Sequence, residues 1–302
     1  MDMPEAAAAG ATVEAVDLGL KGPRGQVFRG VRVKAPPGSL IAIEGPSGSG
    51  RTCLLLTLTG RMKPSEGRAT VGGHHLPKGM SAVRRISAVA NVSGVTDLEP
   101  ALTVGEHLRE RALLERRFGD SLRALLRPRR ERAAAARQRI DAALTAAGLD
   151  QDALPKGPCT ALRDLERLEA LRLSVALALI SRPRLLAVDD ADLKLSAGER
   201  AEVWALLRSV AETGTTVLAV CAEAPQDAMV VSTTPGPQVP RDGDVHPPDG
   251  ERGAQDAPLE AATPEEPSGD TPEEATTPEE PSEDGADDDK ETADALAETG
   301  RA

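Results

Sequence analysis

A glycine-rich turn that joins a β-like run to an apolar, helix-like segment constrains the fold of this chain most. The run Ser39–Glu44 ends directly at this turn. The turn and the start of the helix comprise Gly45, Pro46, Ser47, Gly48, Ser49, Gly50, Arg51, Thr52 and Cys53. The segment matches the pattern G-x-x-x-x-G-K-[ST], except that Arg51 replaces the lysine. Because such a unit surrounds phosphate oxygens with backbone N–H groups, we predict a phosphate-binding loop rather than a plain glycine-rich turn.

The side chains of this loop favour nucleotide binding over catalysis. Gly48 and Gly50 let the backbone approach a phosphate closely, and the Thr52 hydroxyl is a candidate magnesium ligand. Arg51 keeps the positive charge of lysine, but its planar fork differs in shape and reach from an ammonium group. Cys53 offers a thiol, which is a weaker hydrogen-bond donor than a hydroxyl. We therefore expect binding to survive these substitutions better than hydrolysis does.

The segments around the loop alternate between β-like runs and helical patterns. Two β-like runs, Ala15–Leu20 and Val27–Val33, precede the loop. Two buried-type strands, Arg184–Asp189 and Thr215–Val220, enclose the helical pattern at 198–213. This alternation predicts an α/β core with a parallel sheet. Between the two halves of the pattern, an Ala-, Leu- and Arg-rich stretch over 104–147 predicts helices broken at Gly119 and Pro128.

Charge divides the chain into two regions. From Arg241 to the end there are 21 acidic residues against 4 basic ones, whereas residues 1–240 hold 27 against 32. Beyond Pro235 the chain also lacks almost all large apolar side chains, so it cannot bury enough surface to offset chain entropy. We therefore expect one folded domain over residues 1–234 and a disordered acidic tail rich in Pro, Glu and Thr over residues 235–302.

Arginines gather in the predicted helices, with 11 between Arg109 and Arg139. A solvated helix face explains them most simply, and contact with anionic lipid headgroups or with the acidic tail are the alternatives. Nucleic-acid binding is disfavoured, because the chain has no tyrosine and its aromatic residues are Phe28, Phe118 and Trp204 alone. Stacking platforms for bases cannot be built from so few rings. We expect no nucleic-acid partner.

From about Val13 to Val231 the chain resembles an ABC transporter ATPase. The resemblance rests on the phosphate loop, on ALTVGEHL at 101–108 and on PRLLAVDD at 183–190. It implies a P-loop NTPase fold of the ABC type, with an N-terminal antiparallel β part and an α-helical subdomain at about 104–165. In the family, the position of Asp189 holds magnesium through water, and a glutamate at the next position polarises the attacking water. Here that next residue is Asp190, which is one methylene shorter.

Other family positions depart further from the pattern. The signature LSGGQ, expected before the helix that leads to PRLLAVDD, is replaced by Leu165, Glu166, Arg167, Leu168 and Glu169. An acid there would repel the phosphate that this loop contacts across a dimer, and its glycines are missing. The switch histidine falls at Ala222, the glutamine after the strand at 86–90 is replaced by Asn91, and the D-loop aspartate is replaced by Ser196. These changes weaken the apparatus for hydrolysis.

The resemblance implies an ATP-binding subunit that binds Mg-ATP and docks on a separately encoded membrane permease. It implies a homodimer, or a heterodimer with another ABC domain, and a cytoplasmic place at the inner face of the cell membrane. The acidic start of the chain shows no basic leader region. Hydrolysis is expected to be slow or dependent on the partner. The alternative is a catalytically inactive ABC-like module for nucleotide sensing or assembly.

Overall fold

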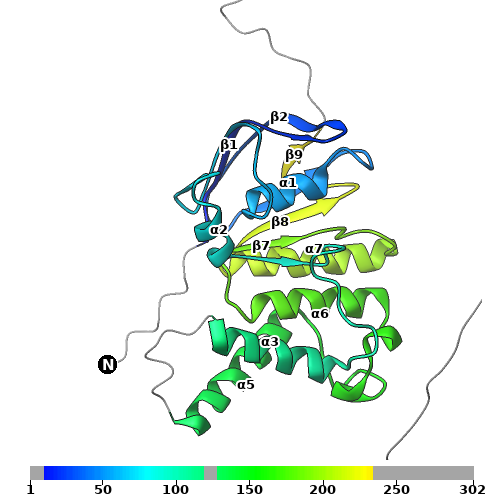
Figure 1. Ribbon diagram of the computed structural model, residues 1–302. Coiled ribbons are helices and arrows are strands. Elements are labelled where there is room, and N and C mark those ends of the chain that lie inside the picture. Colours follow the sequence, from blue (N-terminus) through cyan, green and yellow to red (C-terminus); the bar gives the residue numbers. More distant parts are fainter. Residues whose placement is uncertain (1–9, 119–127, 234–302) are drawn as a thin grey trace, which may run out of the picture. The chain divides into compact units, whose positions relative to one another are not determined.

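The computed structural model of the chain describes residues 10–118 and 128–233 (Figure 1). The chain divides into two units, residues 1–241 and 242–302, and all described residues belong to the first. The predicted break at Gly119 and the predicted tail at 235–302 lie outside the described residues. Within them, strands and helices alternate as the sequence predicts, and the α/β fold class is confirmed.

An antiparallel sheet of four strands is formed early in the chain, in the order β2-β1-β4-β5. Its strands are β1 (Val13–Gly22), β2 (Gly25–Ala35), β4 (Glu66–Val71) and β5 (His74–Leu76). Along β1, buried and exposed residues alternate at first, so that one face packs inward and the other faces solvent. This sheet is the antiparallel β part that the family resemblance implies. The three-residue strand β5 was not predicted, because it is too short to show a period.

A parallel sheet of five strands forms the centre of the fold, in the order β6-β7-β8-β3-β9. Its strands are β3 (Leu40–Glu44), β6 (Ser87–Ala90), β7 (Leu185–Val188), β8 (Thr216–Cys221) and β9 (Met229–Ser232). All of its strand pairs are parallel, so the carboxyl ends of the strands lie at one edge. In open α/β sheets ligands bind at that edge. The edge strand β9 was not predicted, because its residues are mostly exposed.

Both faces of the parallel sheet are buried, which explains its continuous apolar strands. On β3, Ile41 and Ile43 face one core cluster together with the antiparallel sheet and α1 (Arg51–Leu58). The intervening Ala42 faces a second cluster, built mainly from α6 (Arg167–Leu179) and α7 (Ala197–Glu212). In Figure 1, α1 accordingly lies between the two sheets, and α6 and α7 cover the other face. The helix α2 (Met80–Ile86) leads into β6.

The Ala- and Arg-rich stretch forms two of the described helices, α3 (Val104–Phe118) and α5 (Arg129–Ala146). Pro128 is the N-cap of α5 and directly precedes its first residue. The helices α3 and α5 pack on α6 at the far side from the antiparallel sheet (Figure 1). None of the helices within 10–118 and 128–233 combines the length and hydrophobicity that a bilayer crossing requires.

Candidate nucleotide-binding site

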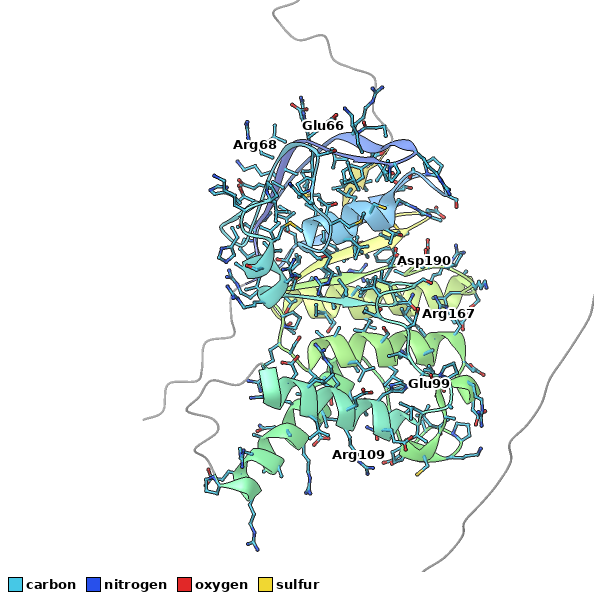
Figure 2. The ribbon with its side chains drawn as sticks, in the orientation of Figure 1. Glu66, Arg68, Glu99, Arg109, Arg167 and Asp190 are labelled. Carbon is cyan, nitrogen blue, oxygen red and sulfur yellow. The ribbon has the colours of Figure 1, made fainter. Side chains whose placement is uncertain are left out.

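The carboxyl-end edge of the parallel sheet brings the predicted site together. Glu44, the last residue of β3, pairs with Cys221 of β8 on one side and with Ser232 of β9 on the other. On the far side of β8, β7 ends at Val188 and leads directly into Asp189. The phosphate loop after β3 and the acidic pair after β7 are therefore separated only by the end of β8. Figure 2 shows Asp190 at this edge.

The glycines of the phosphate loop are required by close contacts and by their backbone conformation. A Cβ added at Gly45 would overlap the hydroxyl oxygens of Ser49 and Thr233. These two hydroxyls are hydrogen-bonded at 2.6 Å, so Thr233 stabilises the conformation of the phosphate loop. At Gly50, with a φ of 84°, an added Cβ would lie 2.8 Å from Val27 Cγ1. Gly48 has a φ of 78°, yet an added Cβ there would meet nothing within 4 Å, so the loop is open on that side.

The N-terminus of α1 has free hydrogen-bonding capacity for a phosphate. Its N-cap is Gly50, and no side chain caps the helix. The first N–H groups of an α-helix have no partner within the helix, and the helix dipole favours an anion near them. The open loop and the uncapped helix together fit the phosphate groups of a nucleotide, as the sequence predicts.

The structure brings the two predicted magnesium ligands together. Asp189 is buried, with 3% of its surface exposed, and burial raises the pKa of its carboxyl group. A hydrogen bond from the Thr52 hydroxyl lowers that pKa in part, and the neighbouring Asp190 carboxylate raises it further. A hydroxyl and a carboxylate beside a phosphate site are ligands of the hard, oxygen type that Mg²⁺ prefers. The residues present therefore fit a magnesium ion.

Asp190 adopts an uncommon backbone conformation, with a φ of 45°. Its N–H group donates to Asp189 Oδ1 at 3.1 Å. This conformation is tolerated by aspartate better than by most residues, and it keeps the two carboxylates adjacent at the end of β7. The side chain is half-buried and is one methylene shorter than the glutamate that the resemblance places there.

The Asn91 side chain makes hydrogen bonds within the protein. Its Nδ2 donates to the Asp189 carbonyl oxygen at 2.8 Å, and its Oδ1 accepts a 3.4 Å hydrogen bond from Arg167. Its backbone N–H group donates to Ser174 Oγ at 2.7 Å. Asn91 thus ties β6 to β7 and α6, and its carboxamide is already engaged. Its φ of 56° belongs to the left-handed region that asparagine tolerates.

The residues at the signature position form a self-capped helix start. Only Leu165 and Glu166 precede α6, because the helix begins at Arg167; we expected the whole segment Leu165–Glu169 to precede it. Glu166 is the N-cap and accepts from the Glu169 N–H group, while Glu169 Oε2 accepts from the Glu166 N–H group at 2.9 Å. This capping box places two carboxylates at the helix N-terminus. Two carboxylates at this helix N-terminus disfavour a bound anion there.

The switch and D-loop positions also carry structural roles. Ala222 is exposed at the end of β8 and has no group that can contact a phosphate. Ser196 is the N-cap of α7: its Oγ accepts from the Glu199 N–H group at 3.3 Å. The Asp192 carboxylate contacts the switch position, where it accepts from the N–H groups of Ala222 and Glu223 at 2.7 and 3.3 Å. Sequence patterns did not identify Asp192, because the contact joins two loops that are distant in the chain.

Arg51 and Cys53 complete the first turn of α1. Arg51 Nη1 donates to the Cys221 carbonyl oxygen at 2.6 Å, so its guanidinium lies against the end of β8. Burial, with a smaller contribution from Asp189, raises the pKa of the Cys53 thiol. Phe28 is only 3% exposed in the core, so it is not available to stack on a base.

The profile of the ABC transporter family matches residues 28–192. A Nod factor export ATP-binding protein from Cupriavidus pinatubonensis is 31% identical over 209 residues, covering 69% of this chain and 54% of that protein. An Fe(3+) ions import ATP-binding protein from Pseudomonas fluorescens is 32% identical over 194 residues, covering 63% and 48%. ABC transporter G family member 49 from Oryza sativa is 31% identical, covering 66% and 13%. The chain thus spans about half or less of the length of these relatives.

Solved structures show the same fold. A subunit of an ABC transporter complex from Clostridium perfringens matches with a TM-score of 0.56 at 20% identity, covering 71% of this chain and 79% of that one. An ATP-binding cassette solved as a dimer in a post-hydrolysis state, with ADP and Pi, matches with a TM-score of 0.54 at 20% identity, covering 70% and 88%. At 20% identity, the similarity to these structures shows the fold alone.

Proposed function

The chain belongs to the ABC transporter family, and from that membership we propose that it is an ATP-binding subunit that couples Mg-ATP to a separately encoded membrane protein. The curated relatives named above carry ATP-binding roles in export and in import, so their names leave the direction of transport open. Family membership by itself does not establish function, which depends on the site.

One observation supports this proposal above the others. The Thr52 hydroxyl lies close enough to the buried Asp189 carboxylate to lower its pKa, and both groups lie beside an open, uncapped phosphate loop. Phosphate donors and magnesium ligands therefore converge at one sheet edge. A magnesium ion held there would supply positive charge that offsets the charge of the phosphates. The loop N–H groups would bind the phosphates, and Thr52 and Asp189 would hold the metal.

Calorimetric titration of the full chain with ATP, in magnesium and in EDTA, tests the proposal directly. Binding in the micromolar to low-millimolar range that requires magnesium is the expected result. Absence of any heat of binding, for a chain that melts cooperatively, would leave the inactive-module alternative. One observation favours that alternative. The residues at the signature, switch and D-loop positions make hydrogen bonds within the protein instead of being free for a nucleotide.

We propose that hydrolysis is slow, because several groups are missing at once. Asp190→Glu is therefore expected to raise turnover by less than about tenfold, although a well-placed catalytic base contributes roughly 10²–10⁴-fold. The remaining defects at Ala222 and Glu166 are unaffected by this change. Phosphate release under saturating Mg-ATP measures the effect. A gain of roughly a hundredfold or more from this single substitution would contradict the argument.

The self-capped start of α6 argues against an ATP-dependent homodimer. In such a dimer each α6 N-terminus would have to receive a phosphate, and here it holds the carboxylates of Glu166 and Glu169. We expect the chain to keep its monomer mass in light scattering when Mg-ATP is added. A heterodimer with an ABC domain of intact signature fits better, since that partner completes one site. A homodimer that appears only with Mg-ATP would refute this expectation.

The wider organisation follows from the same proposal. Residues 1–234 form the nucleotide-binding domain, with a helical subdomain at about 104–165, and residues 235–302 form a tail that the domain does not need for folding. The subunit works at the inner face of the cell membrane, where the permease holds it. The exposed arginines of α3 and α5 then lie on its solvated surface or near anionic lipid headgroups.

A further inference from the structure

Three arginine side chains gather at the edge of the parallel sheet that lies opposite to the phosphate loop. Arg61 follows α1, Arg84 belongs to α2 and Arg111 belongs to α3. Arg61 donates to the side chain of Ser87, the first residue of β6, which marks the amino-end edge of the sheet. Figure 1 shows α2 at this end of the strands. We call Arg61, Arg84 and Arg111 the arginine cluster.

Two adjacent backbone carbonyls hold two of these guanidiniums near each other. Arg61 Nη1 donates to the Thr59 carbonyl oxygen at 3.0 Å, and Arg84 Nη1 donates to the Gly60 carbonyl oxygen at 2.8 Å. Arg61 is half-buried, whereas Arg84 is exposed. Because a guanidinium has five N–H donors, both side chains keep N–H groups that these contacts do not use.

Arg111 approaches the same place from α3. Its Nε donates to the Leu177 carbonyl oxygen near the end of α6 at 3.2 Å, and its Nη2 forms an ion pair with Glu115 at 3.0 Å. The pKa of Arg61 is lowered to about 10, first by burial and then by the positive charges of Arg84 and Arg111. The three charges are therefore close enough to repel one another.

The positive charge of the arginine cluster exceeds the negative charge around it. Among the described residues, Glu115 pairs with Arg111, and no acid pairs with Arg61 or Arg84. The C-terminal ends of α1 and α6, whose carbonyls the cluster contacts, add roughly half a negative charge each. Roughly one positive charge therefore stays unmatched. Charges that are removed from water are normally paired, so this excess favours a bound anion.

We propose that the arginine cluster binds a phosphate group, at a site separate from the nucleotide site. Guanidinium and phosphate pair through parallel N–H···O bonds. A tetrahedral phosphate presents oxygens in several directions, so guanidiniums from different elements can donate to it together. A carboxylate has two oxygens in one plane and a single charge, and it matches the cluster less well. Free phosphate compounds and anionic lipid headgroups both carry the proposed group.

Titration and vesicle binding of the full chain test the two sources of phosphate. Calorimetry with inorganic pyrophosphate, in EDTA and with excess ADP to occupy the phosphate loop, tests a free ligand. Flotation with phosphatidylcholine vesicles, with and without phosphatidic acid, tests a lipid headgroup. Arg84→Gln is expected to lower the affinity for the bound probe about tenfold, the effect of losing one charge-assisted hydrogen bond.

Arg109→Gln is the matched control, since it removes the same charge at an exposed position of α3. Arg109 precedes Arg111 by two residues, which places the two side chains on different sides of the helix. Figure 2 shows Arg109 on the outer side of α3. The control should bind both probes as the wild type does. Thermal melting checks that each variant folds, and Arg84→Lys, which removes the planar fork, replaces Arg84→Gln if the latter melts early.

Each outcome decides the inference. Loss of pyrophosphate affinity in Arg84→Gln supports a free phosphate ligand, and a loss confined to phosphatidic acid vesicles supports a lipid headgroup. Equal losses in Arg84→Gln and Arg109→Gln would show a general effect of charge and would overturn the site. A wild-type chain that binds neither probe would overturn it as well. The proposed function stands or falls by the separate titration with ATP, because the cluster and the phosphate loop lie at opposite edges of the sheet.

Discussion

Asp189→Asn is expected to remove the magnesium-dependent part of ATP binding and to lower the affinity about 10- to 100-fold, the range found when a group that orients a metal ligand is lost. The amide keeps the shape of the side chain but removes the negative charge beside Thr52. Thr52→Ala should have the same consequence, because it removes the other oxygen of the pair. Calorimetric titration in magnesium and in EDTA measures the loss.

Asp152→Asn is the matched control, since it makes the same chemical change at an exposed position far along the chain from the sheet edge. Its affinity for Mg-ATP should equal that of the wild type. If both Asp189→Asn and Thr52→Ala keep the wild-type affinity in magnesium, the metal site proposed between them does not exist.

The largest effect on stability is expected at the central strand β7. Leu186→Ala should lower the free energy of unfolding by about 2–5 kcal/mol, the usual cost of truncating a buried leucine. Leu186 has no exposed surface and belongs to the core cluster formed with α6 and α7. Because β7 pairs on both sides, with β6 and β8, the sheet has little freedom to collapse into the cavity.

Leu113→Ala provides the comparison, since this leucine of α3 is 58% exposed and alanine is an equally good helix former. Its effect should stay within about 0.5 kcal/mol. Denaturant unfolding of both variants gives the two values. Similar losses in the two would show that the core assigned to β7 does not control the stability of the domain.

Several features were predictable because their signals are local. The strand–loop–helix unit at 39–58 combines a fixed spacing of glycines with a change of hydrophobic period, and the structure places β3 and α1 there. The buried strands β7 and β8 read as short apolar runs, as strands covered on both faces must. The strand β9 and the short helix α2 lack such a signal, and the sequence did not indicate them.

Features that join distant segments were not predictable. Thr233 braces the loop through Ser49, and Asp192 holds the N–H groups at the end of β8, yet neither belongs to a motif. The capping box at Ser196 could have been found, since Glu199 follows three residues later, whereas Glu166 is not a residue that the capping-box pattern uses as N-cap. The groups of the family motif are missing at these positions, and local helix caps take their place.

The sequence by itself determined the family, the phosphate loop and the acidic pair at the end of β7, because these depend on short-range spacing along the chain. Only the tertiary structure decided what the substituted residues do. It joined Thr52 to Asp189 and carried the guanidinium of Arg51 to the end of β8, 170 residues away. Such contacts depend on strand order, and strand order is set by packing the whole sheet between its two cores.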